Sequence, residues 1–398
     1  MNLDFISYGR HWIDEDDIAA VAAVLRGERL TQGPVVEQFE ATVAARVGAK
    51  HAVACSSGTA ALHLALLAAG VGPGDETLCP ATTFVATSNC ALYVGASPRF
   101  VDIDYDTIEM RPEAVGVALT AKTKAVLPVH FAGLPADMPG ISRIVRERNP
   151  QAIIVEDASH ALGARYADGA PVGNLRYSDM AVFSFHPVKH VATGEGGMIM
   201  TDRDDLAERL RLFRSHGVTR DPRRLHKPDE GPWYYEMQVL GYNFRLPDMN
   251  CALGIRQMTK LDAFVRRRRE IAAQYRLALA DLDFVQLPPS GAAGGEEADP
   301  ARHLSSWHIY VLRILFDRLG KSRRDVVREL AERGIGTQTH YYPVPLQPYY
   351  RERFGYREGQ FPMAEAHYAR ALTIPLFPAM TDDDVERVIK ALREVLTR

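Results

Sequence analysis

Short apolar segments alternate with helix-length segments over a large central part of the chain. Strands that alternate with helices are typical of parallel βαβ units, in which helices cover both faces of the sheet. Residues 152–155, Ala-Ile-Ile-Val, are apolar throughout, as in a fully buried strand. The pattern therefore predicts an α/β protein built on a parallel sheet. The predicted strands cover residues 51–55, 76–79, 99–101, 124–129, 152–156, 180–185 and 198–201.

Longer segments on either side of this region have helical patterns. Residues 13–26 are amphipathic, with acidic residues in the first turn and Gly27 after the last. A long helix is predicted at about residues 249–280. It contains a run of arginines, residues 266–269, which we interpret as the solvated side of the helix rather than as an anion site.

The C-terminal part of the chain predicts a smaller α/β domain. Residues 288–300 are rich in Gly, Pro and Ala and predict a surface loop. A strand at 309–316 follows, then helices at about 322–333 and 382–397, the last beginning after Thr381. We therefore expect an N-terminal arm (1–14), a large cofactor-binding domain (15–248), and a linking helix with a small C-terminal domain (249–398).

Composition narrows the class of protein and its partners. The 398 residues are 46% hydrophobic and 24% charged, which excludes disorder, collagen and coiled coil as the main architecture. With 47 basic and 50 acidic residues, the net charge is −3. A chain with this charge has no overall electrostatic attraction for nucleic acid or an anionic membrane. The four cysteines show no CxxC spacing and predict reduced thiols. No membrane span or signal peptide is evident, so we expect a cytoplasmic protein.

A small polar turn at residues 55–59, Cys-Ser-Ser-Gly-Thr, joins a strand end to a helix start. A helix N-terminus offers free backbone N–H groups and the positive end of the helix dipole, and both favour phosphate. Gly58 allows close approach and Thr59 adds a hydroxyl. An ordinary helix cap is the more frequent explanation of such a turn.

Two reactive side chains follow other predicted strand ends. Asp157 comes directly after the strand at 152–156, where parallel sheets bind ligands, and a buried carboxylate there needs a cationic partner. Lys189 follows the strand that begins at Met180, and a lysine among apolar groups can act as a Schiff-base nucleophile because its pKa is lowered. A helix cap and an ordinary loop lysine are the alternatives for these residues.

An aromatic residue completes a coherent set. Phe84 follows the strand at 76–79 and can stack on a planar cofactor, although a core Phe is more common. Together, the phosphate turn, the acid, the lysine and the ring match the binding requirements of pyridoxal phosphate (PLP). Its signature is a Schiff-base lysine with an Asp partner for the pyridine nitrogen. The sequence therefore predicts a PLP protein.

Ordered segments along nearly the whole chain carry a resemblance to a known family. They are Leu-Thr-Gln-Gly-Pro (30–34), Ser-Gly-Thr-Ala-Ala-Leu (57–62), Thr-Phe-Val-Ala-Thr (83–87), Glu-Asp-Ala-Ser-His-Ala-Leu-Gly (156–163), Ser-Phe-His-Pro-Val-Lys (184–189), Gly-Glu-Gly-Gly (194–197), Gly-Tyr-Asn-Phe-Arg (241–245), His-Tyr-Tyr-Pro (340–343) and Ile-Pro-Leu (374–376). In these segments the chain resembles the sugar aminotransferases of the DegT/DnrJ/EryC1/StrS family. The resemblance implies PLP fold type I, with a mostly parallel seven-stranded sheet between helices and a smaller C-terminal α/β domain.

The resemblance also implies a role for each matching residue. Lys189 forms the Schiff base, and Asp157 pairs with the pyridine nitrogen. Phe84 stacks on the ring, and His160 lies near the ring face or its phenolic oxygen. The phosphate is held by Gly58, Thr59 and Ser184.

Further residues are implied to contact the substrate or the other subunit. Asn243 is expected to reach the phosphate of the partner subunit, which makes a homodimer necessary for a complete site. The implied substrate contacts are Tyr8, Thr31, Gln32, Arg245, His308, His340 and Tyr341.

Within the family, His160 and residues 184–197, 213–217 and 233–236 are most similar to the aminotransferases of pseudaminic acid biosynthesis. This implies L-glutamate as amino donor and C4 of UDP-4-keto-6-deoxy-β-L-AltNAc as acceptor. Another UDP- or dTDP-linked keto sugar, for a surface polysaccharide or an antibiotic, is an alternative.

Two other functions fit a PLP protein less well. In PLP-dependent sugar dehydratases the lysine is typically replaced by histidine, so Lys189 argues against that activity. A PLP-binding regulatory protein without turnover usually carries a DNA-binding domain, and we find neither spare length nor a basic patch for one.

Overall fold

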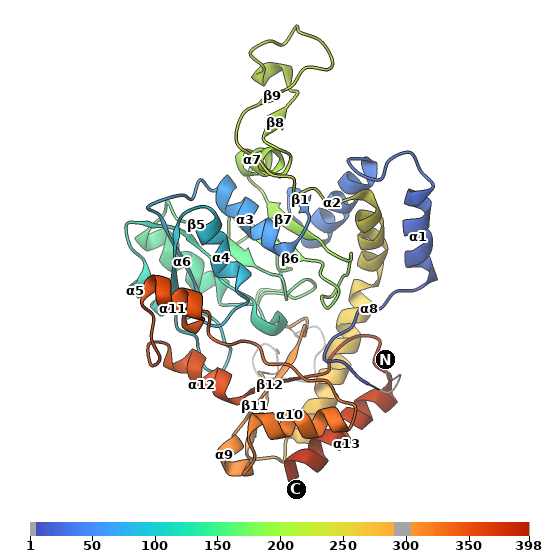
Figure 1. The fold of residues 1–398 in the computed structure, drawn as a ribbon, viewed down its shortest axis with the longest axis vertical. Coiled ribbons are helices and arrows are strands. Elements are labelled where there is room, and N and C mark those ends of the chain that lie inside the picture. The colour runs from blue at the N-terminus through green and yellow to red at the C-terminus, as the bar shows by residue number, and fades with distance from the viewer. Residues whose placement is uncertain (1–4, 290–303, 398) are drawn as a thin grey trace.

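The core of the protein is a seven-stranded sheet with the strand order β1-β7-β6-β5-β4-β2-β3 (Figure 1). The computed structural model describes residues 5–289 and 304–397. Strand β7 runs antiparallel to both of its neighbours, and the other pairs are parallel. The expected mostly parallel α/β fold is therefore confirmed. The strands are β1 (His51–Cys55), β2 (Glu76–Pro80), β3 (Ser97–Val101), β4 (Thr123–Val126), β5 (Ile153–Asp157), β6 (Met180–Ser184) and β7 (Gly197–Thr201).

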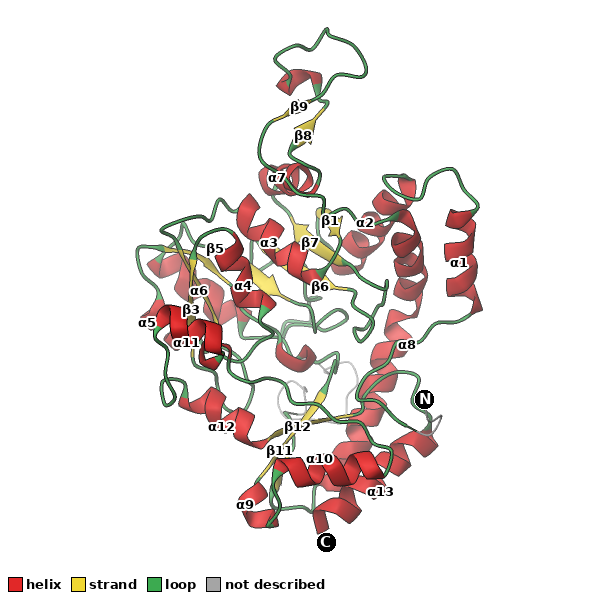
Figure 2. Cartoon of the chain, viewed as in Figure 1, coloured by secondary structure: helices red, strands yellow, loops and turns green. Residues whose placement is uncertain are grey.

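Helices cover both faces of this sheet, as the layers in Figure 2 show. Along β1, Val53 and Cys55 join the hydrophobic cluster that contains α3, α4 and α7. Ala52 and Ala54 join the cluster that contains α2, α5, α6 and α8. Because side chains alternate between faces, a strand buried on both faces is apolar at every position. The helices are α2 (Pro34–Val47), α3 (Gly58–Ala68), α4 (Ala86–Tyr93), α5 (Pro112–Ala118), α6 (Met138–Arg148), α7 (Asp204–Arg214) and α8 (Asp248–Leu279).

Helix α8 connects the large sheet to a smaller antiparallel sheet with the order β10-β11-β12. Its C-terminal half, including Ile271 and Tyr275, packs in a third hydrophobic cluster with β11, β12 and α13. The N-terminal helix α1 (Glu15–Leu25) packs beside α8, where Lys260 pairs with Asp17 at 2.7 Å. The remaining elements are β10 (Val285–Gln286), β11 (Tyr310–Ile314), β12 (Ala371–Ile374), α9 (Phe316–Leu319), α10 (Arg323–Glu332), α11 (Pro348–Phe354), α12 (Pro362–Arg370) and α13 (Asp382–Thr397).

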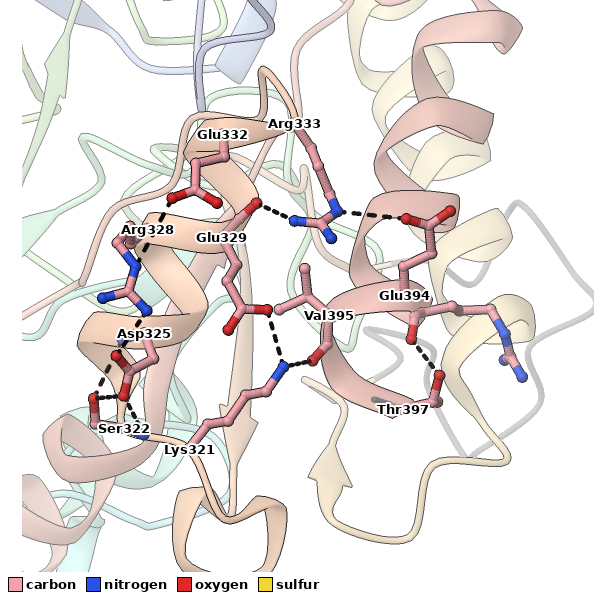
Figure 3. A network of polar contacts seen from close by, with 11 residues as sticks. Lys321, Ser322, Asp325, Arg328, Glu329, Glu332, Arg333, Glu394, Val395 and Thr397 are labelled. Atoms are coloured by element: carbon pink, nitrogen blue, oxygen red, sulfur yellow. Dashed lines mark hydrogen bonds and ion pairs between the residues drawn. The ribbon is translucent and has the colours of Figure 1, made fainter.

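Polar contacts join α10 and α13 on the outside of the small sheet (Figure 3). The Lys321 amine donates to Glu329 Oε2 at 2.9 Å and to the Val395 carbonyl at 2.8 Å. Arg333 pairs with Glu394 at 3.4 Å. These contacts fix the two helices against each other.

A hairpin of β8 (Val218–Thr219) and β9 (Glu236–Met237) projects away from the rest of the molecule (Figure 1). It carries large apolar side chains that are exposed, including Trp233, which is 70% exposed, and Met237, which is 65% exposed. Exposed apolar side chains gathered on one projection are typical of an interaction surface.

All of the predicted strands form, and their ends differ by at most three residues from those expected. The Thr381 hydroxyl accepts from the Asp384 amide at 3.1 Å, so α13 begins as predicted. Most of the predicted loop at 288–300 lies outside the described residues. The division into arm, large domain and small domain stays a prediction. No helix in the described ranges is both long enough and apolar enough to cross a membrane.

The interpretation of residues 266–269 as a solvated helix side is wrong for Arg268. Its side chain is fully buried, and its guanidinium donates to three backbone carbonyls. These carbonyls come from segments distant along the chain, so nothing in the local pattern distinguishes Arg268 from its solvated neighbour Arg266.

Candidate active site

A cavity of about 780 Å³ lies at the carboxyl ends of the parallel strands. Because β1, β2, β5 and β6 run in the same direction, their ends meet at one edge of the sheet. This edge brings together residues that are far apart in the sequence. The cavity is lined by eleven of the residues singled out in the sequence: Tyr8, Gly58, Thr59, Phe84, Asp157, His160, Ser184, Lys189, His308, His340 and Tyr341.

The N-terminus of α3 forms one wall of the cavity. Ser57 caps the helix, since its hydroxyl accepts from the Ala60 amide at 3.1 Å. The first helical residues, Gly58 and Thr59, line the cavity. A Cβ at position 58 would lie 2.9 Å from the Cβ of Ser184 and 3.1 Å from its hydroxyl. Only glycine therefore lets the helix end approach the Ser184 hydroxyl so closely.

Asp157 ends β5 at the base of the cavity and is 6% exposed. Its Oδ2 accepts from the Thr87 hydroxyl at 2.7 Å, and its Oδ1 accepts from the Ser159 amide at 3.2 Å. These contacts fix the carboxylate plane. The structure shows no helix cap by Asp157, because a turn rather than a helix follows β5.

Lys189 reaches the same cavity from the loop after β6. Burial lowers the pKa of Lys189 to about 8, with Asp157 acting against this shift and the Arg268 charge adding to it. The lysine Nζ lies 3.5 Å from Nε2 of His308. An amine with so low a pKa is partly unprotonated near neutral pH and can attack an aldehyde.

Aromatic rings surround the space in front of Lys189. The His160 and His308 rings are 4.2 Å apart, and the Tyr341 hydroxyl lies 3.4 Å from Nε2 of His160. Burial, followed by the nearby Lys189 charge, holds the pKa of both histidines well below its ordinary value. The rings are therefore neutral. Phe84 is 55% exposed although it lines the cavity, which leaves its ring free to cover a planar group.

Four of the predicted site residues lie outside this cavity. Thr31, Gln32 and Asn243 are exposed, and Gln32 and Arg245 line a second hollow of about 600 Å³. The two segments adjoin, because the Asp248 carboxylate accepts from the Gly33 amide at 2.9 Å. We call residues 31–32 and 243–245 the outer patch. The structure does not bring the outer patch to the cavity of its own chain.

The sequence reasoning missed two residues that support the site. Thr87 donates to Asp157 and contacts the Thr83 hydroxyl at 2.7 Å. Thr83 and Thr87 lie four residues apart and follow the end of a predicted strand. This spacing could have indicated that the two hydroxyls lie close together near the site. Arg268 acts on Lys189 through its charge, and the sequence contains no signal for its burial.

The comparisons with known proteins agree with this geometry. The model of the DegT/DnrJ/EryC1/StrS aminotransferase family matches residues 11–393, and the chain belongs to this family. It is 41% identical over 393 residues to the spore coat polysaccharide biosynthesis protein SpsC of Bacillus subtilis (strain 168), covering 98% of this chain and 97% of that protein.

Solved structures resemble the chain over its whole length. Helicobacter pylori PseC, an aminotransferase involved in the biosynthesis of pseudaminic acid, has a TM-score of 0.88 and 26% identity, covering 99% of each chain. The PMP form of the putative sugar aminotransferase Spr1654 from Streptococcus pneumoniae has a TM-score of 0.88 and 30% identity, covering 98% of this chain and 99% of that one. These findings support a PLP-dependent sugar aminotransferase of fold type I.

The cavity residues fit PLP. The helix end at Gly58 and Thr59 and the hydroxyl of Ser184 supply donors for a phosphate, in a cradle that a Cβ at position 58 would fill. Asp157 offers a fixed carboxylate for a ring nitrogen, and Lys189 offers an amine for the aldehyde. Nδ1 of His160 is buried with no partner among the described residues, which leaves it free for a polar atom of the ring.

Proposed function

We propose that the protein transfers the amino group of L-glutamate to C4 of a nucleotide-linked 4-keto-6-deoxy sugar, with Lys189 and Asp157 as catalytic residues. One observation supports these roles most strongly. A half-buried lysine with a pKa of about 8 shares one cavity with a carboxylate fixed at 2.7 Å by Thr87 and with a helix end open to phosphate.

Each residue has a task that its surroundings support. PLP supplies an aldehyde that carries the amino group and a ring that takes up negative charge. Gly58, Thr59 and Ser184 hold its phosphate, and Phe84 covers the ring. Asp157 holds the proton on the ring nitrogen, because its own position is fixed by Thr87 and Ser159.

The Lys189 amine moves protons as well as binding the aldehyde. With PLP bound, the unprotonated Nζ would remove the Cα proton of L-glutamate. The amino group would stay with PLP, and water would supply the keto oxygen of the 2-oxoglutarate that leaves. In the second half of the reaction, Lys189 delivers a proton to C4 of the sugar, where the new amine is formed. Its fixed position on one side of the cavity sets the configuration at C4.

Two keto sugars are candidates for the acceptor. The similarity to PseC supports the intermediate of pseudaminic acid biosynthesis, UDP-4-keto-6-deoxy-β-L-AltNAc. The 41% identity to SpsC supports another UDP- or dTDP-linked sugar destined for a surface polysaccharide. Tyr8, His308, His340 and Tyr341 line the cavity and are the proposed sugar contacts in the same chain.

We further propose that the protein is a homodimer with shared active sites. Three residues of the outer patch, Thr31, Gln32 and Asn243, are exposed, and the patch lies outside the cavity of its own chain, although its residues match the family motifs. Asn243 pairs with Ser215, just before the first strand of the projecting hairpin, whose exposed Trp233 and Met237 favour contact with a second copy. In this arrangement Asn243 completes the phosphate site of the partner, and Thr31, Gln32 and Arg245 reach its substrate.

A substrate panel tests the function. The protein is loaded with PLP and given L-glutamate, and the absorbance change of the bound cofactor and the formation of 2-oxoglutarate are measured. UDP-, dTDP- and GDP-linked keto sugars are then added singly, and the amino sugar is identified by mass spectrometry and NMR. We expect conversion of UDP-4-keto-6-deoxy-β-L-AltNAc.

Each possible outcome separates the alternatives. Conversion of a different keto sugar keeps the activity and replaces the acceptor. PLP binding without any spectral change on adding L-glutamate would contradict the aminotransferase and favour a protein that binds PLP without turnover. The variant Lys189→Ala provides the inactive control, because it lacks the amine that binds the aldehyde.

A further inference from the structure

Arg268 is a buried cation next to the proposed active site. Its side chain is 0% exposed in the middle of α8. Nη1 donates to the carbonyls of Trp307 at 3.2 Å, His308 at 2.9 Å and Leu376 at 2.8 Å. Within residues 5–289 and 304–397, this guanidinium forms no ion pair with a carboxylate, and burial alone lowers its pKa. A buried charge without a counterion is costly and is retained only where neighbouring dipoles stabilise it.

The carbonyls that Arg268 holds belong to the segment that presents His308 to Lys189. Trp307 has a φ of 53°, a left-handed conformation that non-glycine residues rarely adopt unless their surroundings enforce it. The next residue, His308, lies with Nε2 at 3.5 Å from the Lys189 amine. Nη1 of Arg268 therefore holds the backbone turn on which the position of His308 depends.

The same segment also contacts the residue that follows Lys189. The His190 ring nitrogen Nε2 lies 2.9 Å from the carbonyl of Ser306. Lys189 is thus bordered on two sides by a turn whose shape Arg268 fixes. Arg268 therefore acts on the position of Lys189 through this turn, by way of the hydrogen bonds to its carbonyls.

The charge of Arg268 acts on Lys189 in addition to this geometry. Burial lowers the pKa of Arg268 to about 9, which still leaves it charged at neutral pH. A nearby like charge disfavours protonation of the Lys189 amine. The four histidines that face this amine are held neutral by burial, so Arg268 and Asp157 are the charges that oppose each other there. These histidines are His160, His190, His308 and His340.

We propose that Arg268 is a positioning residue of the active site, which holds the backbone turn at Trp307 and His308 and so places the His308 ring against the Lys189 amine. The inference rests on the proposed function, in which Lys189 is the covalent residue. Arg268 could also be a purely structural cross-link between α8 and the small sheet. Such a cross-link would leave the protonation of Lys189 unchanged, which distinguishes it from the proposed role.

A pair of variants separates the charge from the hydrogen bonds. Arg268→Gln and Arg268→Lys both lose the Nη1 group that donates to the three carbonyls, but only the lysine keeps the charge. The full-length protein is freed of cofactor, and the rate constant for capture of PLP is followed by absorbance from about pH 6 to about pH 10. This rate reports the unprotonated fraction of Lys189, and for the wild type it should be half-maximal near the Lys189 pKa of about 8.

We expect the two variants to differ in one parameter. In Arg268→Gln the half-maximal pH rises by about one unit, so that capture near neutral pH is about tenfold slower. In Arg268→Lys the half-maximal pH stays at the wild-type value. Both variants have a lower plateau rate at high pH, because His308 is no longer held in place.

Tyr275→Phe is the matched control. Tyr275 lies on the same buried side of α8 and donates to the Pro375 carbonyl at 2.8 Å, next to the Leu376 carbonyl that Arg268 holds. Its loss removes a hydrogen bond from the same segment without removing a charge. We expect the capture profile of this variant to match the wild type, with thermal unfolding measured for all variants to compare their stability.

The results that overturn the inference are distinct from a failure of the proposed function. If wild-type protein captures no PLP, or Lys189→Ala captures it equally well, the proposed function fails. If wild type captures PLP and Arg268→Gln has the same half-maximal pH, the charge has no role. If Arg268→Gln does not fold, an unchanged plateau in Arg268→Lys overturns the positioning role by itself.

Discussion

The cavity around Lys189 and the outer patch both contain motif residues, but only the cavity gathers them in one chain. Lys189, Asp157 and Gly58 come from three separate strand ends and line one space of about 780 Å³. The outer patch, by contrast, exposes Gln32 and Asn243, and the second hollow that Gln32 lines contains none of the residues of the cavity.

The cavity and the outer patch are assembled in different ways. Parallel strands bring their carboxyl ends to the same edge, so residues that follow those strands meet without any further contact. The two segments of the outer patch are joined by the Asp248 carboxylate, and residues 243–245 are held further by backbone hydrogen bonds to Ser56 and Arg214. A patch held rigidly at the surface is suited to acting on a neighbouring molecule.

The largest effect should come from removing the lysine. Lys189→Ala deletes both the covalent link and the proton carrier, so we expect transamination to fall by about a thousandfold or more, a barrier increase of about 4 kcal/mol. The measurement is the formation of 2-oxoglutarate under steady-state conditions. The exposed Lys390, on α13, provides the control variant Lys390→Ala, which should retain full activity. Activity of Lys189→Ala within about tenfold of wild type would refute the assignment.

The next effect should come from the acid at the base of the cavity. Asp157→Asn keeps the hydrogen bond from Thr87 but cannot hold a proton on the ring nitrogen by charge. We expect kcat to fall by about 100-fold, which corresponds to about 2.7 kcal/mol. Asp137→Asn is the control, because Asp137 caps α6 and asparagine is an equally good cap. Normal turnover of Asp157→Asn would place the acid elsewhere.

A smaller effect is expected in the phosphate cradle. Gly58→Ala places a methyl group 2.9 Å from the Cβ of Ser184, so the helix end must move away from the space proposed for the phosphate. We expect the Kd for PLP to rise by about tenfold, which is about 1.4 kcal/mol. Gly72→Ala is the control, since a Cβ there meets no atom of the described residues within 4 Å. Equal PLP affinity in the two variants would show that the phosphate binds elsewhere.

Much of the cavity could be predicted from the sequence because its residues sit next to strand ends. The strand at His51–Cys55 has the bounds that the apolar pattern predicts, and Gly58 follows it within one turn. Asp157 and Lys189 lie at or just after the ends of β5 and β6 in the same way. A periodic pattern fixes where a strand ends, and the direction of parallel strands then fixes which ends lie together.

Other features depend on contacts that no local pattern contains. Arg268 belongs to a run of arginines, and only the carbonyls of Trp307, His308 and Leu376, brought in from distant segments, account for its burial. The outer patch is predicted by the family resemblance and not by the apolar pattern, because neither residues 31–32 nor residues 243–245 follow a strand that the pattern predicts.

The cavity gathers its motif residues within one chain and the outer patch does not. This difference is explained if the outer patch of one subunit completes the cavity of another. Lys189→Ala and Asn243→Ala should then each have little activity alone. A mixed dimer of the two should contain one working site, because one cavity keeps Lys189 and receives Asn243 from its partner. The two inactive variants are unfolded together in equal amounts, refolded, and assayed for transamination.

Random pairing makes half of the dimers mixed, so the refolded mixture should recover about a quarter of the wild-type activity. Each variant refolded alone should remain inactive, and differently tagged subunits confirm that mixed dimers form. If mixed dimers form and no activity returns, Asn243 does not act across the interface, and the cavity of a single chain must account for catalysis without it.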